Sequence, residues 1–140
     1  MADFESHMDD LAERANKANE RAQASLKATK ETLQSQVSTA RASIEKTNRQ
    51  LHEKATTSEP AKRWSAARET WVAHTAEIRR KADAEKAKHD ASHAKRRAEW
   101  AEADAMESIE FAYLALEEAE YEVLDAALAR AEADELAAKV

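Results

Sequence analysis

Two histidines, His89 and His93, lie one helical turn apart in the stretch KHDASHAKRR, residues 88–97. Glu85 lies one turn before His89, so on a continuous helix the three side chains would share a face. Imidazole and carboxylate groups bind Zn²⁺ and related ions, but a stable site takes further ligands from another element. His89, His93 and Glu85 are therefore candidate metal ligands, and we favour a solvated charged face on which the histidines titrate. On that interpretation association is tighter near about pH 6 than near about pH 8.

The string HDASH also resembles the H-E-x-x-H motif of zinc peptidases, with Asp90 in the place of the catalytic glutamate. The shorter side chain and the lack of further ligand context argue against a peptidase. The sequence contains no cysteine and no glycine, which excludes thiol nucleophiles, thiolate metal sites and glycine-rich phosphate loops. We therefore predict that the protein is not an enzyme and uses no cofactor.

Carboxylate side chains suggest a second kind of metal site. Glu120 falls within an apolar stripe that includes Tyr113, Leu116 and Val123, where a carboxylate needs a hydrogen-bond donor. We expect Glu120 at the edge of an interface, paired with Arg or Lys. Carboxylate-bridged metal bundles require Glu-x-x-His pairs on two helices, and this sequence has no such pair.

Tryptophans near basic residues form a third candidate site. Trp64, Trp71 and Trp100 lie near many arginines and lysines, an arrangement that also occurs on membrane-binding and nucleic-acid-binding faces. The net charge of −6 repels phosphate, so nucleic acid is disfavoured as a partner. We interpret Trp64 and Trp71 as residues that pack against another helix, and peripheral membrane contact remains an alternative.

The composition dictates which elements position these residues. The chain has no glycine and a single proline, Pro60, and is rich in Ala, Glu, Lys and Arg. The turns that connect β-strands commonly contain glycine, whereas this composition is typical of long helices. We predict an all-α fold of long antiparallel helices, a helical hairpin or three-helix bundle resembling a coiled coil, in a single elongated domain spanning residues 1–140.

The first predicted helix spans about residues 3–56. Its apolar positions recur every eleven residues, at Leu11, Ala22, Leu33, Ile44 and Ala55. An eleven-residue repeat gives about 3.67 residues per turn, which favours straight or gently right-handed packing.

The segment ANKANERAQASLKATKETLQ resembles the eleven-residue amphipathic repeats of apolipoproteins and late-embryogenesis-abundant proteins. This resemblance covers about a third of the chain. It implies reversible adsorption to lipid or protection of membranes during drying.

Two further boundaries are predicted. The stretch TTSEP, residues 56–60, predicts a turn in which Thr57 or Ser58 caps the next helix. That helix spans about residues 59–101. A capping box formed by Asp104 and Glu107 predicts a second break near residues 101–104 and a third helix at about residues 105–137. The alternative is that the second and third helices are continuous.

The segment from Met106 to Ala131 is the most apolar part of the chain, and we name it the apolar segment. Its apolar residues surround much of the helix, so it requires burial on more than one side. The residues predicted to make this interaction are Ile109, Phe111, Tyr113, Leu116, Tyr121, Val123, Leu124 and Leu128.

Charge is segregated along the chain. Residues 61–100 contain eleven basic and six acidic residues, whereas residues 101–140 contain two basic and twelve acidic residues. Contacts between the two regions would therefore be electrostatically favourable, within one chain or between chains.

These patterns predict a structural or adaptor protein that self-associates or binds a partner helix through the apolar segment. The alternative is a peripheral lipid-binding or stress-protective protein that acts through residues 4–55 and 61–82. No apolar run approaches the roughly 20 residues of a membrane span, and we expect a cytoplasmic location.

Overall fold

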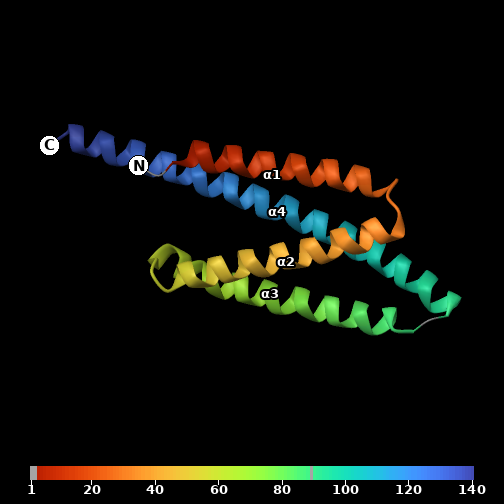
Figure 1. The fold of residues 1–140 in the computed structure, drawn as a ribbon. Helices are drawn as coiled ribbons and strands as arrows, with labels where there is room; N and C mark the ends of the chain where they lie inside the picture. The colour runs from red at the N-terminus through yellow and green to blue at the C-terminus, as the bar shows by residue number, and fades with distance from the viewer. Residues whose placement is uncertain (1–2, 89) are drawn as a thin grey trace. The chain divides into compact units, whose positions relative to one another are not determined.

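The computed structural model describes residues 3–88 and 90–140, and the regular structure within these ranges is entirely α-helical. The helices are α1, Phe4–Ser25; α2, Lys30–Ala55; α3, Glu59–Lys86; and α4, Ala91–Ala138 (Figure 1). The predicted all-α fold class is thereby confirmed. Among the described helices, none combines the length and apolar character needed to cross a membrane.

Each of these helices begins at a side chain that accepts a hydrogen bond from a free backbone N–H group. Such caps satisfy donors that have no partner within the helix. The caps are Asp3 to Ser6 N–H (3.1 Å), Thr29 to Thr32 N–H (3.2 Å), Ser58 to Ala61 N–H (3.3 Å) and Asp90 to His93 N–H (2.8 Å). The helix starts therefore follow from short polar residues that cap the first turn.

The helices end without glycine. No non-glycine residue in the described part of the chain has a positive φ, so left-handed C-caps are not used. At the end of α2, the Thr56 N–H donates to Glu53 O at 3.1 Å and the Thr56 hydroxyl donates to the same carbonyl at 2.7 Å. A tightened last turn and a threonine hydroxyl thus satisfy carbonyls that a glycine motif would otherwise satisfy.

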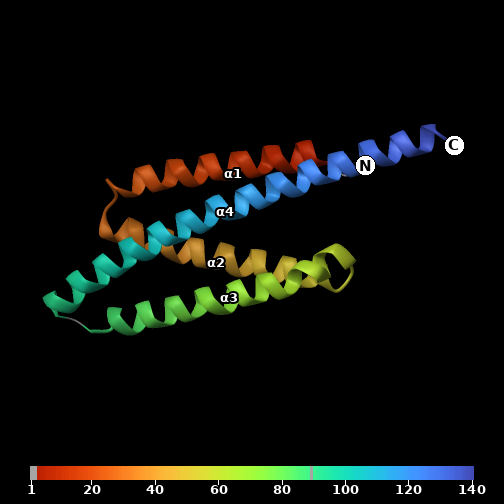
Figure 2. The same ribbon diagram turned by 180° about the vertical axis from the view of Figure 1, so that it is seen from behind.

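The predicted first helix, residues 3–56, is wrong in one respect, because the structure divides it into α1 and α2 at residues 26–29 (Figure 2). The Thr29 hydroxyl supplies the cap that starts α2. The eleven-residue stripe also carries no apolar residue between Leu26 and Leu33. Little packing is therefore lost when the helix breaks there.

The predicted turn at residues 56–60 is confirmed, since α2 ends at Ala55 and α3 begins at Glu59. The predicted break near residues 101–104 is wrong, because α3 ends at Lys86 and α4 begins at Ala91. Asp90 acts as the helix cap, whereas Asp104 lies within α4 between Ala103 and Ala105. Alanine is the strongest helix former, so helix continues through Asp104.

Contacts within the chain divide it into two units, Met1–Glu77 and Ile78–Val140, with the boundary inside α3. The first unit holds α1, α2 and most of α3, and the second holds the end of α3 and all of α4. The single domain expected from the sequence stays a prediction. Burial is sparse, because Ala61, at 8% exposure, is the one buried residue among those described.

Candidate interaction surfaces

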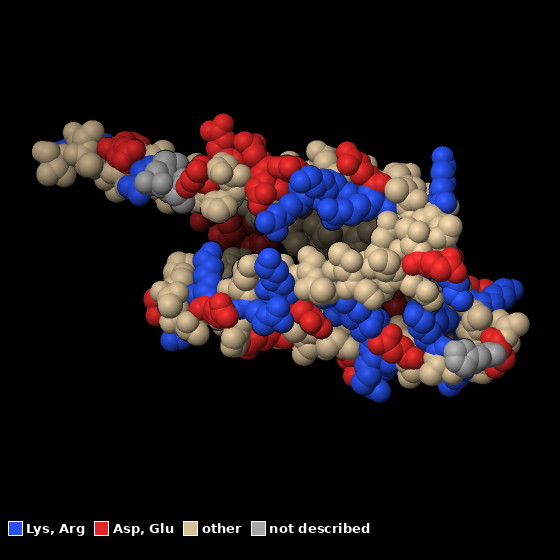
Figure 3. Space-filling model, viewed as in Figure 1, with Lys and Arg blue, Asp and Glu red and all other residues tan. Residues whose placement is uncertain are grey.

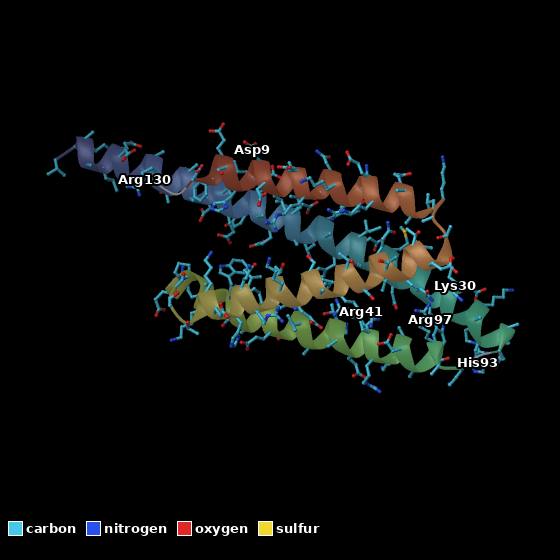
Figure 4. The ribbon with its side chains drawn as sticks, viewed as in Figure 1. Asp9, Lys30, Arg41, His93, Arg97 and Arg130 are labelled. Atoms are coloured by element: carbon cyan, nitrogen blue, oxygen red, sulfur yellow. The ribbon has the colours of Figure 1, made fainter. Side chains whose placement is uncertain are left out.

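The histidine stretch lies at the break between α3 and α4. His93 is in the first turn of α4, and its ring Nδ1 hydrogen-bonds the Asp90 carboxylate (Figure 4). The His93 backbone N–H donates to that carboxylate as well, and this bond is the main reason that the pKa of Asp90 is lowered below its usual value. The His93 side chain lowers it further. Asp90 and His93 thus form a helix-capping pair.

The structure describes two of the three candidate metal ligands, and each of them has another partner. Glu85, near the end of α3, pairs with Lys88 at 3.1 Å, and His93 pairs with Asp90. His89 lies outside the described residues. Over residues 3–88 and 90–140 no group of three His, Cys, Asp or Glu side chains could hold a metal ion.

In the first unit, α2 and α3 form an antiparallel hairpin held near its turn by Arg68 (Figures 1 and 2). The Arg68 guanidinium donates to Ala61 O at 2.8 Å and to Leu51 O on α2 at 3.5 Å. His52 Nδ1 lies 3.8 Å from Glu69 Oε1 across the same hairpin. A groove of about 420 Å³ runs alongside, with Leu51, Arg68 and Val72 in its wall. This groove is small and largely apolar, and its polar lining includes Ser65, His52 and Glu69.

Trp64 and Trp71 lie beside the packed face of α3. The half-buried positions of this helix in the first unit are Ser65, Arg68, Val72 and Thr75, next to the buried Ala61. Trp64 and Trp71 lie off that stripe and are 46% and 39% exposed. As interaction residues, Trp64 and Trp71 stay a prediction.

In the second unit, the end of α3 and the start of α4 enclose a larger groove of about 600 Å³, which we name the basic groove. Its lining residues are Ile78, Arg80, Lys81, Ala82, Ala84, Glu85, Arg97, Trp100, Ala101 and Asp104. The Arg97 Nε is buried and has no hydrogen-bond partner. A buried N–H group without an acceptor is unfavourable, so this groove favours a ligand that brings an acceptor.

The apolar segment lies within α4, and its large side chains are exposed. The exposed fractions of Ile109, Phe111, Tyr113, Leu116, Tyr121, Leu124 and Leu128 lie between 46% and 61%, and Val123 is half-buried. On the face shown in Figure 3, uncharged side chains reach the surface among the charged ones. An exposed apolar stretch of this length is typical of a surface that binds another protein.

The sequence draws attention to Glu120, whereas the structure raises the pKa of its neighbour Glu122. Glu120 is exposed, so it needs no buried partner. The pKa of Glu122 is raised, chiefly by desolvation and then by a hydrogen bond with Glu118 and the negative charges of Glu118 and Asp125. The spacing of Glu118, Glu122 and Asp125 places them on one helical face, a pattern that could have identified this cluster.

Comparison of the chain with family models, curated proteins and solved structures gives no match. The candidate surfaces are accordingly interpreted from their own chemistry.

Proposed function

We propose that this chain is a non-enzymatic structural or adaptor protein that self-associates through the apolar segment of α4. The observation that carries the proposal is the exposure of seven large apolar side chains along one continuous helix. Covering a half-exposed side chain of this size contributes about 1 kcal/mol. Three such side chains from each of two copies together contribute about 6 kcal/mol, which exceeds the lower estimates of the cost of association, about 4 kcal/mol.

The proposal includes coiled-coil-like pairing of helices and a cytoplasmic location, as expected from the composition. Long side chains at three- and four-residue steps interdigitate when two helices cross at a shallow angle. Each copy has a mass of 15.6 kDa, so a dimer is readily distinguished from a monomer in solution.

Light scattering coupled to size exclusion tests this function. The unmodified chain is expected to elute at twice the monomer mass at about 100 µM. The double variant Leu114→Gln and Leu128→Gln is expected to elute as a monomer with unchanged helicity, since both side chains are exposed. Leu26→Gln is a matched control, because Leu26 is 79% exposed but lies between α1 and α2. A monomeric unmodified chain, or dissociation caused equally by Leu26→Gln, contradicts the proposal.

A peripheral lipid-binding function is the alternative, and the exposure of apolar residues on α1 and α2 favours it. Leu11, Val37 and Ile44 are 40%, 52% and 39% exposed. Circular dichroism with and without anionic vesicles distinguishes the two functions. Helicity that is complete in buffer and unchanged by vesicles contradicts the lipid-binding function. Low helicity that rises with vesicles supports it and contradicts self-association of a preformed helix.

A further inference from the structure

The two ends of α4 carry opposite charge. Lys95, Arg96 and Arg97 lie in its first two turns, whereas twelve acidic and two basic residues follow residue 100. Because α4 is continuous from Ala91 to Ala138, it keeps Arg97 and Glu132 about 50 Å apart. The acidic end of a helix therefore cannot reach the basic groove of its own chain.

The basic groove presents donors and apolar surface in excess of acceptors. Arg97 carries the unsatisfied buried N–H, and Lys81 lines the same groove. Of the two acids in the wall, Glu85 already pairs with Lys88. Trp100, 51% exposed, supplies an apolar wall. The chemistry of this groove fits an amphipathic helix with carboxylates beside leucines.

We propose that a second copy of this chain binds in the basic groove with the acidic end of its α4, forming an antiparallel, two-fold symmetric pair. This inference rests on the proposed self-association and adds the contact surface and the orientation. In a symmetric pair each copy inserts its acidic end into the groove of the other, so the assembly closes at two copies.

Full overlap of two antiparallel α4 helices sets the register. Arg97 and Glu132 are equally far from their respective ends of the helix, so overlap brings Arg97 of one copy to Glu132 of the other. Within one helix, Arg97 and Glu132 are separated by five repeats of seven residues. They therefore lie on the same contact face of a left-handed helix pair. Trp100 and Leu128 share a second position of this repeat, which places an apolar contact next to the ion pair.

Three exposed apolar residues, Phe111, Leu114 and Tyr121, continue the same seam between the two ends. Full overlap also brings Asp125 of the second copy near Asp104. Lys81, which lines the groove together with Asp104, supplies the opposite charge there. The inferred interface therefore combines apolar contacts between its two ionic ends with the acids Glu107 and Glu118, which lie on the same seam.

Charge reversal tests the pairing of Arg97 with Glu132. Arg97→Glu is expected to raise the dimer dissociation constant about tenfold, because two ion pairs per dimer become repulsive. The double variant Arg97→Glu and Glu132→Arg is expected to restore it, since an antiparallel pair places the two changes opposite each other. Arg130→Glu makes the same charge change in α4 outside the groove and is the matched control. An equal effect of Arg130→Glu, or no rescue by the double variant, overturns the inference.

Orientation is measured separately with a spin label at Ala133→Cys, an exposed position in a chain that has no native cysteine. An antiparallel pair places the two labels about 55 Å apart, whereas a parallel pair places them within about 20 Å. A dimer with the short distance refutes the antiparallel groove contact but leaves the proposed self-association intact. A monomer at all accessible concentrations refutes both.

Discussion

At the scale of single residues, Asp90 determines where α4 begins. Its carboxylate accepts the His93 backbone N–H at 2.8 Å and also hydrogen-bonds the His93 ring. Because these bonds hold the pKa of Asp90 below the ordinary 3.8, the charged form stabilises the folded chain. This stabilisation is present above the ordinary pKa and is lost as the pH falls through the lowered one.

Asp90→Ala is expected to lower the melting temperature by a few degrees at neutral pH and to leave it unchanged in acid below the lowered pKa. Circular dichroism melts at both pH values measure this difference. Asp104→Ala is the matched control, because Asp104 also begins a capping-box sequence but lies inside α4. An equal loss from Asp104→Ala would mean that α4 begins at the later acid.

Glu122 has the opposite effect on stability. Its raised pKa means that the charged form is unfavourable in the folded chain, so its unfavourable contribution is relieved as the pH falls through the raised pKa. We expect Glu122→Gln to raise the melting temperature at neutral pH by one or a few degrees and to have no effect in acid.

A double-mutant cycle with Glu118→Gln isolates the charge term in this effect. If the two carboxylates repel each other, the gain from Glu122→Gln shrinks once Glu118 is neutral. An undiminished gain assigns the effect to desolvation alone, which is the larger cause of the raised pKa.

At the scale of helices, the break between α1 and α2 depends on Thr29. Its hydroxyl accepts from the Thr32 N–H at 3.2 Å and donates to the Thr32 hydroxyl at 2.9 Å. Thr29→Ala removes this cap, which costs the broken form about 1 kcal/mol, and inserts the strongest helix former. We expect residues 26–29 to become more helical, as measured by backbone chemical shifts.

Thr47→Ala is the control for this prediction, because Thr47 lies within α2 and is followed by Gln50 at the capping-box position. Removing that hydroxyl is expected to leave the helix boundaries unchanged. If Thr47→Ala shifted the helix boundaries and Thr29→Ala did not, the break between α1 and α2 would not depend on the Thr29 cap.

The same pair of threonines shows how far the sequence predicts the fold. The missing glycine predicts helix throughout, and TTSEP predicts the turn before α3, because both signals are local. Thr29 and Thr47 each lie inside a gap in the apolar stripe and could each cap a helix, yet only Thr29 starts one. Local signals therefore predict where a break is permitted, and packing determines which break forms.

The candidate interaction surfaces also differ in how far the sequence predicts them. The apolar segment is predictable, since its residues are contiguous and their character is local. The roles of Arg68 and Arg97 are not, because one depends on carbonyls across a hairpin and the other on a groove formed by two helices. The sequence alone does not distinguish these arginines from other basic residues, because their roles depend on partners that the fold brings near them.

At the scale of the whole molecule, the basic region from residue 61 and the acidic region from residue 101 carry charges of opposite sign. Charges arranged in blocks favour specific orientations and accelerate association, although each exposed pair contributes little stability. The overall charge of −6 repels a second copy in every orientation, so the arrangement of the charge blocks has to select the productive one.

Ala61 is the one described residue that is buried, and this has a consequence for the thermodynamics of unfolding. Unfolding a single copy exposes less new apolar surface than unfolding a globular chain of this length, so its heat-capacity increment should fall below the usual value of about 12–15 cal/mol/K per residue. The denaturant dependence should be shallow for the same reason. Calorimetry on dilute samples measures the heat-capacity increment of the single copy, and calorimetry on concentrated samples measures that of the associated chain. A heat-capacity increment of the usual size in the dilute sample would contradict the prediction. If copies associate through α4, the increment grows with concentration, because much of the hydration change then belongs to the assembly.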